Sequence, residues 1–402
     1  MPGVNATATA ANARAALGTP PRPRDTAAVR EIVRSAIDRG TKLRIVGRGT
    51  WLEAGRPVAS GAEPLALDAL TGIVDYTPGD LTLTARAGTT LAEIADVTRA
   101  NGQWLALAPW GGDDGSLGAT AATASAGPVS GAFGTPRDVV IGLEVVAGTG
   151  DIIRGGGRVV KNVAGFDLTR LMVGAWGTLG IITEVSVRLR GLPERDLSVA
   201  MPAPPSQAGL GELLTRLRAA LVAPIALELI DTSLAARLGL EAAPFILARV
   251  VGNDDAISAQ REAFAGLADV AEVDPSVWTR LRTAEPPAAS VVRLSSTVAR
   301  FAETWGSATA LAATGPAGYA HGSVLRSVAR VVIPNESGNL PSSAAQRLGS
   351  LKHETRVFER LPAALWPSLA PAAVTDRISR GIRGAFDPDH LLNPGILGET
   401  PA

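Results

Sequence analysis

Hydrophobic and polar positions follow two periods along this chain, and each period predicts a different kind of element. Apolar residues spaced by three and four positions predict amphipathic helices, the first of which begins after Asp25 and ends at Gly40. Further helices are predicted over residues 90–101, 168–173, 210–221, 256–267 and 372–385. Short apolar or alternating runs predict strands over residues 43–46, 65–67, 81–86, 139–146, 152–154, 179–189, 226–230, 245–251 and 329–333. Residues 278–305 are less regular in pattern than the segments before them.

The pattern changes character after Pro193, which indicates two domains. A proline-rich linker at residues 202–205 separates a strand-rich first half from a second half in which helices and strands alternate. The 402 residues are long for one domain. We expect an α+β chain with a disordered tail over residues 1–22 and domains over 23–192 and 193–384. A C-terminal segment over residues 385–402 is expected to return to the first domain.

Three glycine-rich stretches interrupt the periodic pattern. The central one, Gly155–Glu184, contains more glycine than a core element needs, and glycine costs backbone entropy where nothing requires it. It predicts loops against a flat, phosphate-bearing cofactor, with a glycine-rich hairpin beside a sheet as the alternative. Pro109–Gly134 is almost entirely Gly, Ala, Ser and Thr, and indicates either close approach of a ligand or a flexible linker. Residues 47–51 follow a strand and indicate either an anion-binding turn or a plain one.

Two common phosphate-binding motifs are excluded. Leu52 stands where the third glycine of a Rossmann fingerprint is required, and the chain has no Gly-Lys pair for a P-loop. The 38 basic and 38 acidic side chains cancel, which leaves no electrostatic signal for nucleic-acid binding. Without cysteine the chain forms no disulfide, thiolate zinc site or iron–sulfur cluster of its own. No apolar run approaches the ~20 residues that span a bilayer, so we expect a soluble cytoplasmic protein, peripheral to the inner membrane only through partner subunits.

Three spaced signatures resemble the PCMH-type FAD-binding domain of vanillyl-alcohol oxidase-type flavoproteins. They are GRGT at Gly47–Thr50, GSLGATAATASAG at Gly115–Gly127 and KNVAGFDLTRLMVGAWGTLGIITE at Lys161–Glu184. Within that family the chain resembles the FAD-binding subunits of glycolate oxidase, through GRPVAS at residue 55, GIVDYTPGDLTLTARAGTTLAEI at residue 72 and FDPDHLLNPG at residue 386. The resemblance covers residues 23–192 and the last twenty well, and the middle of the chain loosely.

The resemblance implies a two-part FAD-binding domain followed by a cap domain. FAD would be bound non-covalently, because the first loop lacks the histidine to which some relatives attach it. The first two loops would hold the diphosphate through backbone N–H groups, Ile182 would meet the adenine, and Lys161, Asn162 and Asn393 would lie nearer the flavin. The implied FAD-binding residues are Val46, Gly47, Arg48, Gly49, Thr50, Trp51, Pro109, Ser116, Leu117, Gly118, Ala119, Ala122, Gly127, Lys161, Asn162, Gly177, Ile181, Ile182 and Asn393.

This chain departs from the family pattern at three positions. Thr120 and Ala124 stand where relatives commonly have Asn, and Trp176 stands where an acidic residue is frequent. Each departure puts an individual contact in doubt rather than the family resemblance.

The three histidines differ in what they suggest. His321 is the candidate catalytic base or substrate contact, with a structural role as the alternative. Val328 stands where related dehydrogenases need a second metal-binding histidine, so we expect no metal site. His353 lies in a charged stretch and is expected to be solvated, whereas His390 is expected to be structural.

The resemblance implies oxidation of a small 2-hydroxy acid, glycolate or D-lactate, by hydride transfer to flavin N5. Two alternatives stay open: a non-catalytic FAD-binding electron-transfer subunit, and a stand-alone flavin oxidase for a sugar-like alcohol. The expected partners are the small hydroxy acid, a related flavoprotein subunit and an iron–sulfur subunit.

Overall fold

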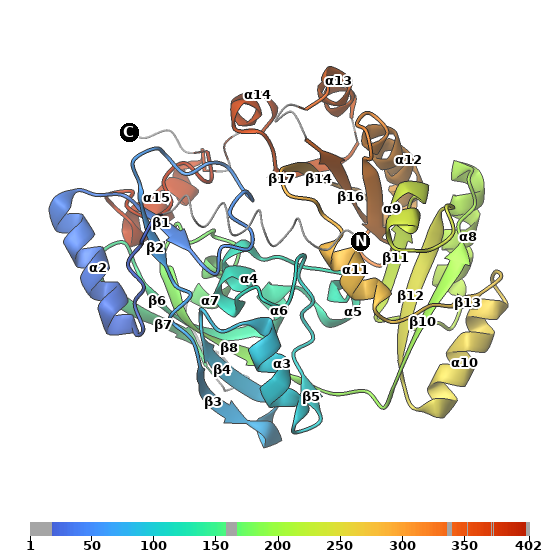
Figure 1. Ribbon diagram of the computed structural model, residues 1–402, viewed down its shortest axis with the longest axis horizontal. Helices are drawn as coiled ribbons and strands as arrows, with labels where there is room; N and C mark the ends of the chain where they lie inside the picture. Colours follow the sequence, from blue (N-terminus) through green and yellow to red (C-terminus); the bar gives the residue numbers. More distant parts are fainter. Residues whose placement is uncertain are drawn as a thin grey trace. The chain divides into compact units, whose positions relative to one another are not determined.

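The computed structural model of the chain describes residues 18–157, 167–335, 340–351, 353–370, 372 and 374–398. These residues form two compact units (Figure 1). The first unit takes residues up to Ala126, then Gly134–Leu192 and the described residues after Pro371. The second takes Gly127–Phe133 and Pro193–Ala370. The expected α+β fold class is therefore confirmed. Of the expected tail over residues 1–22, residues 1–17 lie outside the described residues, whereas Pro21 O accepts from Ala66 N at 3.1 Å and Arg22 pairs with Asp68.

The first unit is built on a five-stranded antiparallel sheet with the strand order β3-β4-β8-β6-β7. Its strands are β3 (Ile73–Thr77), β4 (Thr82–Arg86), β8 (Ile181–Arg188), β6 (Val140–Val146) and β7 (Ile152–Gly156). Two small pairs accompany it: β1 (Leu43–Val46) with β2 (Glu63–Ala66), which are parallel, and β5 (Gln103–Trp104) with β9 (Arg190–Gly191). The helices and the 3₁₀ turn are α2 (Thr26–Arg39), η1 (Pro78–Asp80), α3 (Leu91–Arg99), α4 (Leu117–Thr123), α6 (Pro136–Val139), α7 (Leu168–Met172) and α15 (Arg377–Phe386).

The predicted helix ends in this unit are formed by the capping chemistry that the sequence encodes. The Asp25 side chain accepts a hydrogen bond from Ala28 N, and Gly40 ends α2 with a left-handed φ of 63°. Thr90 and Glu93 form a complete capping box at the start of α3. These caps satisfy backbone donors that a helix end otherwise leaves unpaired.

The C-terminal segment is part of the core of the first unit. Leu391 and Leu392 are 1% and 0% exposed and belong to the same hydrophobic cluster as the sheet. The buried Asp387 carboxylate accepts the N–H groups of both leucines at 2.8 and 3.0 Å and pairs with Arg383. His390 lies in this turn with φ of 48°. Asp387 therefore organises the segment that ends at the predicted cofactor residue Asn393.

The second unit is one eight-stranded antiparallel sheet with helices packed on it. The strand order is β13-β10-β12-β11-β15-β16-β14-β17. The strands are β10 (Arg195–Pro202), β11 (Ala226–Ile230), β12 (Phe245–Gly252), β13 (Ala271–Glu272), β14 (Ala289–Ser295), β15 (Tyr319–Ser323), β16 (Val328–Pro334) and β17 (Thr355–Arg360). The α-helices are α5 (Ser130–Phe133), α8 (Gln207–Ala219), α9 (Thr232–Arg237), α10 (Asp254–Ala265), α11 (Val277–Thr283), α12 (Phe301–Ala312), α13 (Ser342–Ser350) and α14 (Trp366–Leu369). The 3₁₀ turns are η2 (Val298–Arg300) and η3 (Ala363–Leu365).

The hydrophobic core of this unit lies on one face of its sheet. Helices α8, α10, α12 and α13 supply apolar side chains to the same cluster as alternate residues of the strands. On β11, Leu227 and Leu229 belong to that cluster, so the intervening Glu228 faces the other side of the sheet. This alternation decides where the polar residues of the second unit gather.

In two places the structure differs from the sequence-based expectations. Residues 278–305 contain α11, β14 and the start of α12, and Arg293 within β14 breaks the apolar pattern that would have revealed the strand. The last helix begins at Arg377 rather than residue 372, because Asp376 caps it by accepting from Ser379 N at 2.9 Å.

Candidate functional site

The first predicted loop presents a row of backbone donors. It follows β1, and Gly49 takes the left-handed conformation with φ of 77°. Within the part of the chain that the structure describes, the backbone N–H groups of residues 47–51 make no hydrogen bond to protein atoms. Buried N–H groups in folded proteins nearly always have a partner, and Gly49 is buried. The loop therefore has the donors that an anionic ligand requires.

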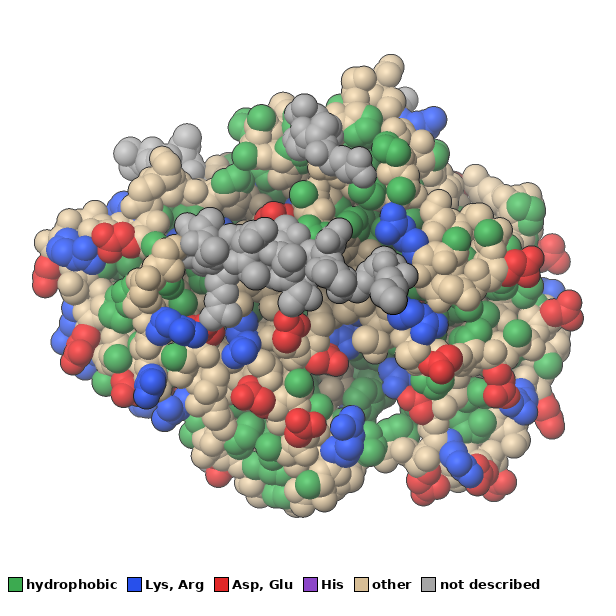
Figure 2. All heavy atoms as spheres, in the orientation of Figure 1, with side chains coloured by type: hydrophobic (Ala, Val, Ile, Leu, Met, Phe, Trp, Pro, Cys, Tyr) green, Lys and Arg blue, Asp and Glu red, His purple; other side chains and the backbone are tan. Residues whose placement is uncertain are grey.

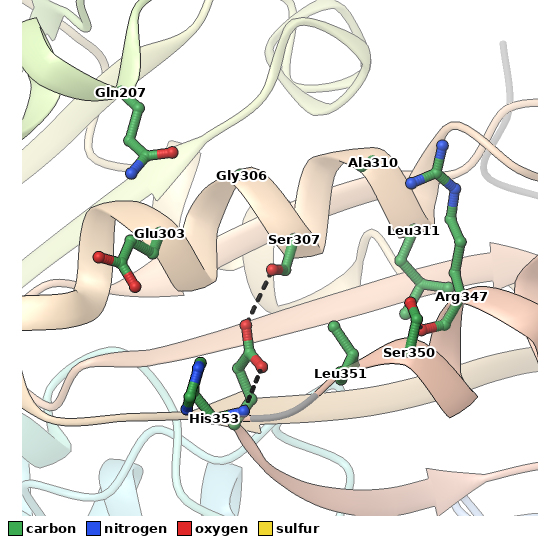
Figure 3. A pocket seen from close by; sticks show the side chains of 11 residues that line it. Gln207, Glu303, Gly306, Ser307, Ala310, Leu311, Arg347, Ser350, Leu351 and His353 are labelled. Carbon is green, nitrogen blue, oxygen red and sulfur yellow. Dashed lines mark hydrogen bonds between the residues drawn. The ribbon is translucent and has the colours of Figure 1, made fainter.

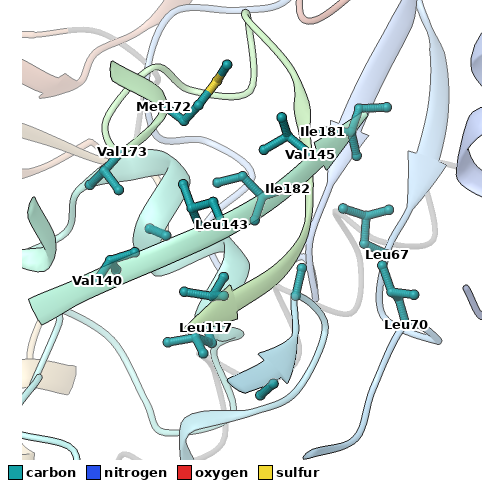
Figure 4. Packing of buried hydrophobic residues seen from close by; sticks show 14 of the residues in the cluster. Leu67, Leu70, Leu117, Val140, Leu143, Val145, Met172, Val173, Ile181 and Ile182 are labelled. Carbon is teal, nitrogen blue, oxygen red and sulfur yellow. The ribbon is translucent and has the colours of Figure 1, made fainter. Parts of the chain in front are cut away.

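The second loop packs directly on the first. A Cβ atom added to Gly47 would lie 3.0 Å from Ser116 Oγ and 3.1 Å from Ala119 Cβ, so the two loops meet where Gly47 has no side chain. Leu117 is fully buried in the core of the first unit and anchors α4 there (Figure 4). The predicted residues of the two loops are thus brought together.

The expected backbone donors at the start of α4 already have partners. Leu117 N donates to Thr89 O at 2.9 Å, and Gly118 N donates to Ala87 O at 2.8 Å. Ala119 N donates to Ser116 Oγ at 3.4 Å. The reason is that residues 87–89 run beside the first turn of α4 and accept its N–H groups. This arrangement leaves the first loop as the main source of backbone donors, with the second loop as its support.

Residues 174–177 join the second loop to the C-terminus. Gly174 N and Trp176 N donate to the carbonyl oxygens of Ala121 and Ala122 at 3.0 and 2.8 Å. A Cβ on Gly177, which has φ of 67°, would lie 3.0 Å from Asn393 Nδ2. This turn therefore needs glycine for its conformation and for the approach of Asn393.

Asn393 acts as a clamp between two of these segments. Its Oδ1 accepts from Ile45 N at 2.7 Å, and its Nδ2 donates to Trp176 O at 2.8 Å. Its own N–H donates to Leu43 O at 2.9 Å, and the residue is 4% exposed. The predicted cofactor residue Asn393 thus holds the end of β1 and the Trp176 turn in place.

The remaining predicted residues fall into three groups. Ile181 and Ile182 are the first residues of β8 and are buried in the core. They extend past the end of the neighbouring strand β4, which pairs with residues 184–188 of β8. Val46 and Pro109 are buried in the first unit, whereas Gly127 clusters with the second unit. Lys161 and Asn162 lie outside the described residues.

Two departures from the family pattern lie at left-handed backbone positions. Ala124 ends α4 in the left-handed conformation with φ of 51°, and Trp176 has φ of 54°. Residues with a side chain rarely adopt that conformation, and Asn does so more readily than most. Both positions therefore carry backbone strain in this chain.

The residues present fit a dinucleotide cofactor. Unpaired donors on the first loop, the side-chain-free contact at Gly47 and the small residues of the second loop suit a diphosphate held close to the backbone. The buried Ser125 hydroxyl at the end of α4 has no hydrogen-bond partner in the described protein. These groups would hold FAD.

The second unit carries a buried polar pair at the predicted residue His321. His321 Nδ1 lies 3.3 Å from Glu228 Oε2, and the two residues are 2% and 1% exposed. Burial raises the pKa of Glu228 to about 8, although Arg326, Ser323 and Arg330 oppose the shift. Burial and the charge of Arg330 hold the pKa of His321 well below its usual value. At neutral pH the imidazole is therefore neutral, and the carboxyl is largely protonated.

A network of arginines and glutamates adjoins this pair, and the sequence analysis missed it. Arg330 pairs with Glu359 at 2.6 Å and with Glu285 at 2.7 Å. Arg360 pairs with Glu285 at 3.1 Å, and Arg293 lies 3.5 Å from Glu359. A charged residue inside an otherwise apolar strand, as in ALELI at 226–230 and VARVVIP at 328–334, is the signal that could have found it. Among the described residues, no group of three or more His, Cys, Asp or Glu side chains is arranged to hold a metal ion.

A separate pocket of about 500 Å³ lies on the helix side of the same sheet (Figure 3). Glu354 accepts from Ser307 Oγ at 2.8 Å and from His353 N at 3.2 Å, and the exposed Arg347 lines the other end. His321 is not among the lining residues. This pocket is therefore distinct from the polar pair.

Charges on the visible face are mixed. Basic and acidic side chains alternate over both units in Figure 2, with no broad patch of one sign. Among the described residues, no helix has the length and hydrophobicity to cross a membrane.

Comparison with known proteins supports the cofactor and the fold. Residues 21–156 match the model of a family described as FAD binding domain. The chain is 33% identical to the glycolate oxidase subunit GlcE of Escherichia coli over 264 residues, which cover 65% of this chain and 69% of GlcE. It is 36% identical to a probable mitochondrial D-lactate dehydrogenase of Danio rerio over 46% of this chain and 37% of that protein. This chain thus spans little more than a third of that dehydrogenase.

A solved structure shares the whole architecture. The structure of p-cresol methylhydroxylase with substrate bound superposes with a TM-score of 0.74, covering 94% of this chain and 88% of that one at 15% identity. The chain therefore belongs to the family of FAD-binding oxidoreductases that includes the GlcE subunit of glycolate oxidase, and it shares the fold of p-cresol methylhydroxylase.

Proposed function

We propose that this chain is the FAD-binding subunit of a complex that oxidises a small 2-hydroxy acid such as glycolate or D-lactate. The observation that carries the proposal is the similarity to GlcE over 65% of the chain. The D-lactate dehydrogenase of Danio rerio favours the same class of substrate. Non-covalently bound FAD would supply the hydride acceptor, flavin N5.

The chain's own contribution to this chemistry is a proton acceptor. Oxidation of a hydroxyl group to a carbonyl releases a hydride and a proton, and the proton needs a base. The imidazole of His321 is neutral, so one ring nitrogen has a lone pair that can take the proton. We assign Nδ1–H as the donor to Glu228 Oε2, with the carboxyl proton on Oε1, so that Nε2 is the nitrogen that accepts the substrate proton.

A second candidate function is a non-catalytic FAD-binding subunit that passes electrons between partners. A substrate carboxylate needs positive charge near it. Arg330, Arg360 and Arg293 each contact a glutamate, which offsets most of their charge. The chain has no Cys, so an iron–sulfur relay would belong to a partner subunit.

Anaerobic mixing tests whether the chain acts alone. The FAD-loaded chain is mixed with glycolate and, separately, with D-lactate, and the flavin absorbance at its visible maximum is followed. We expect slow or absent bleaching alone, recovered when a related flavoprotein subunit and an iron–sulfur subunit are added. Dye reduction by the isolated chain near the ~10 s⁻¹ typical of enzymes would contradict the subunit proposal.

His321→Asn tests the assignment of the base. Removing a general base should lower turnover in the complete complex roughly 10²- to 10⁴-fold, with FAD content unchanged. His353→Asn is the matched control, because His353 is an exposed histidine of the same unit. If His321→Asn retains full turnover, His321 is not the base and the electron-transfer function is favoured.

A further inference from the structure

Trp176 has an unusual backbone conformation for a large side chain. Its φ of 54° lies in the left-handed region, which bulky residues rarely adopt. Such a conformation is strained and persists only where surrounding contacts hold it. The contacts of Trp176 therefore show what the strained turn achieves.

The Trp176 ring packs against the first FAD loop. It stacks on Trp51 with ring centroids 6.5 Å apart and an interplanar angle of 13°. A Cβ on Gly55 would lie 2.9 Å from the Trp176 ring, so the indole lies directly against that glycine. Trp51 is the last residue of the row of unpaired backbone donors.

The Trp176 backbone contacts the other segments of the site. Its N–H donates to Ala122 O on α4, and its carbonyl accepts from Asn393 Nδ2 at 2.8 Å. One residue thus links the first loop, the second loop and the C-terminal segment. Each of these contacts joins two protein groups, so the arrangement can form before a cofactor binds.

We propose that Trp176 is a positioning residue that holds the first loop in its FAD-binding conformation before FAD binds. Among the described residues, the backbone donors of this loop have no protein partners, so the loop would otherwise lose conformational entropy when it becomes ordered on FAD binding. The indole stack orders the loop before FAD binds and so reduces this loss. The proposal rests on FAD binding and is independent of the substrate.

The test compares FAD binding by variants of the full chain. Trp176→Gly accepts the positive φ but removes the ring, and Trp51→Leu removes the other ring from ordinary backbone. Each should weaken FAD binding about tenfold and slow FAD association in stopped-flow, because the loop must then be ordered on binding. The double variant should bind FAD no more weakly than the single variant of lower affinity, because both substitutions remove the same stack.

Controls separate positioning from general stability. Ala317→Gly changes a left-handed residue of the second unit, outside the stack and the FAD-binding loops, and should leave FAD affinity unchanged. Trp176→Phe keeps an aromatic face and should restore most of the affinity. The near-ultraviolet circular dichroism of the apo-protein should change in both single variants and no further in the double variant.

Two results would overturn the proposal. One is unchanged FAD affinity in Trp51→Leu. This variant is sufficient for the test if Trp176→Gly does not fold. The other is full additivity in the double variant. Because FAD binding is measured without substrate, failure here leaves the hydroxy-acid proposal standing, and the reverse also holds.

Discussion

Glu228 is a carboxyl group buried in the middle of a sheet, and its ionisation opposes folding. Its pKa rises from 4.5 to about 8, because burial penalises the charged form. The folded state therefore holds a proton that the unfolded state has released over this range. Stability contributed by the neutral carboxyl is present below pH 4.5 and falls as the pH rises to about 8.

Glu228→Gln should remove this pH dependence. Between pH 7 and 9 the wild-type free energy of unfolding should fall by roughly 1.4 kcal/mol more than that of the variant. The window lies above the range in which His321 gains a proton in the unfolded state, so its opposite effect contributes little there. Urea denaturation at several pH values measures the difference, and parallel profiles for the two proteins would contradict it.

Asn393 shows, also at the residue scale, how one side chain connects two segments that are distant in the sequence. The amide pairs with a strand residue 348 positions away and with a turn 217 positions away. The buried amide needs both partners, because an unpaired polar group there would cost roughly 1–3 kcal/mol. The position is thus best understood as a support for the cofactor loops.

At the scale of elements, the proposed FAD site is a set of loops at the ends of strands and short helices. The first loop leaves β1, the second enters α4, and the third leads from α7 into β8. The contact at Gly47 brings the first two together. Hydrogen bonds from residues 174 and 176 to α4 add the third.

Gly47→Val should separate the first two loops. The new side chain would meet Ser116 Oγ and Ala119 Cβ at 3.0–3.1 Å, and its further methyl groups have no space. We expect FAD affinity, measured by fluorescence titration, to fall at least tenfold while the apo-protein stays folded by far-ultraviolet circular dichroism. Gly79→Ala is the control, because a Cβ there meets nothing within 4 Å. Normal FAD binding by Gly47→Val would mean that the contact between the loops is dispensable.

At the scale of the whole molecule, the main hydrophobic clusters of the two units are separate among the described residues. The cluster around Leu83 contains only residues of the first unit, and the cluster around Leu229 only residues of the second. Each core has its own sheet. Two cores of this kind allow the units to unfold separately.

Calorimetry of the apo-protein should therefore show two transitions. Leu83→Ala should lower the midpoint of one and Leu229→Ala that of the other, since each substitution removes fully buried apolar volume costing about 2–5 kcal/mol. Saturating FAD should raise the midpoint of the transition that Leu83→Ala lowers, because FAD at a hundredfold excess over Kd adds about 2.7 kcal/mol to the free energy of unfolding of that unit. A single transition lowered by both substitutions would show that the two units unfold together.

The sequence by itself determined the local elements and the kind of cofactor. Asp25 and the Thr90–Glu93 pair set helix starts, because capping depends on residues only three positions apart. The glycine-rich stretches and their order indicated the FAD-binding domain, which the comparisons confirm. The sequence did not reveal β14, because Arg293 interrupts its apolar residues. A strand that is buried on both faces is recognised by an unbroken apolar run.

Only the tertiary structure decided which distant residues meet. The stack of Trp51 on Trp176, the Asn393 clamp and the pair of Glu228 with His321 join residues tens to hundreds of positions apart. Their pairing follows from strand order, as when β15 lies between β11 and β16 and so brings His321 between Glu228 and Arg330. Burial of Glu228 and the resulting rise of its pKa likewise need the finished sheet, because a charge is desolvated only when neighbours from several elements exclude water.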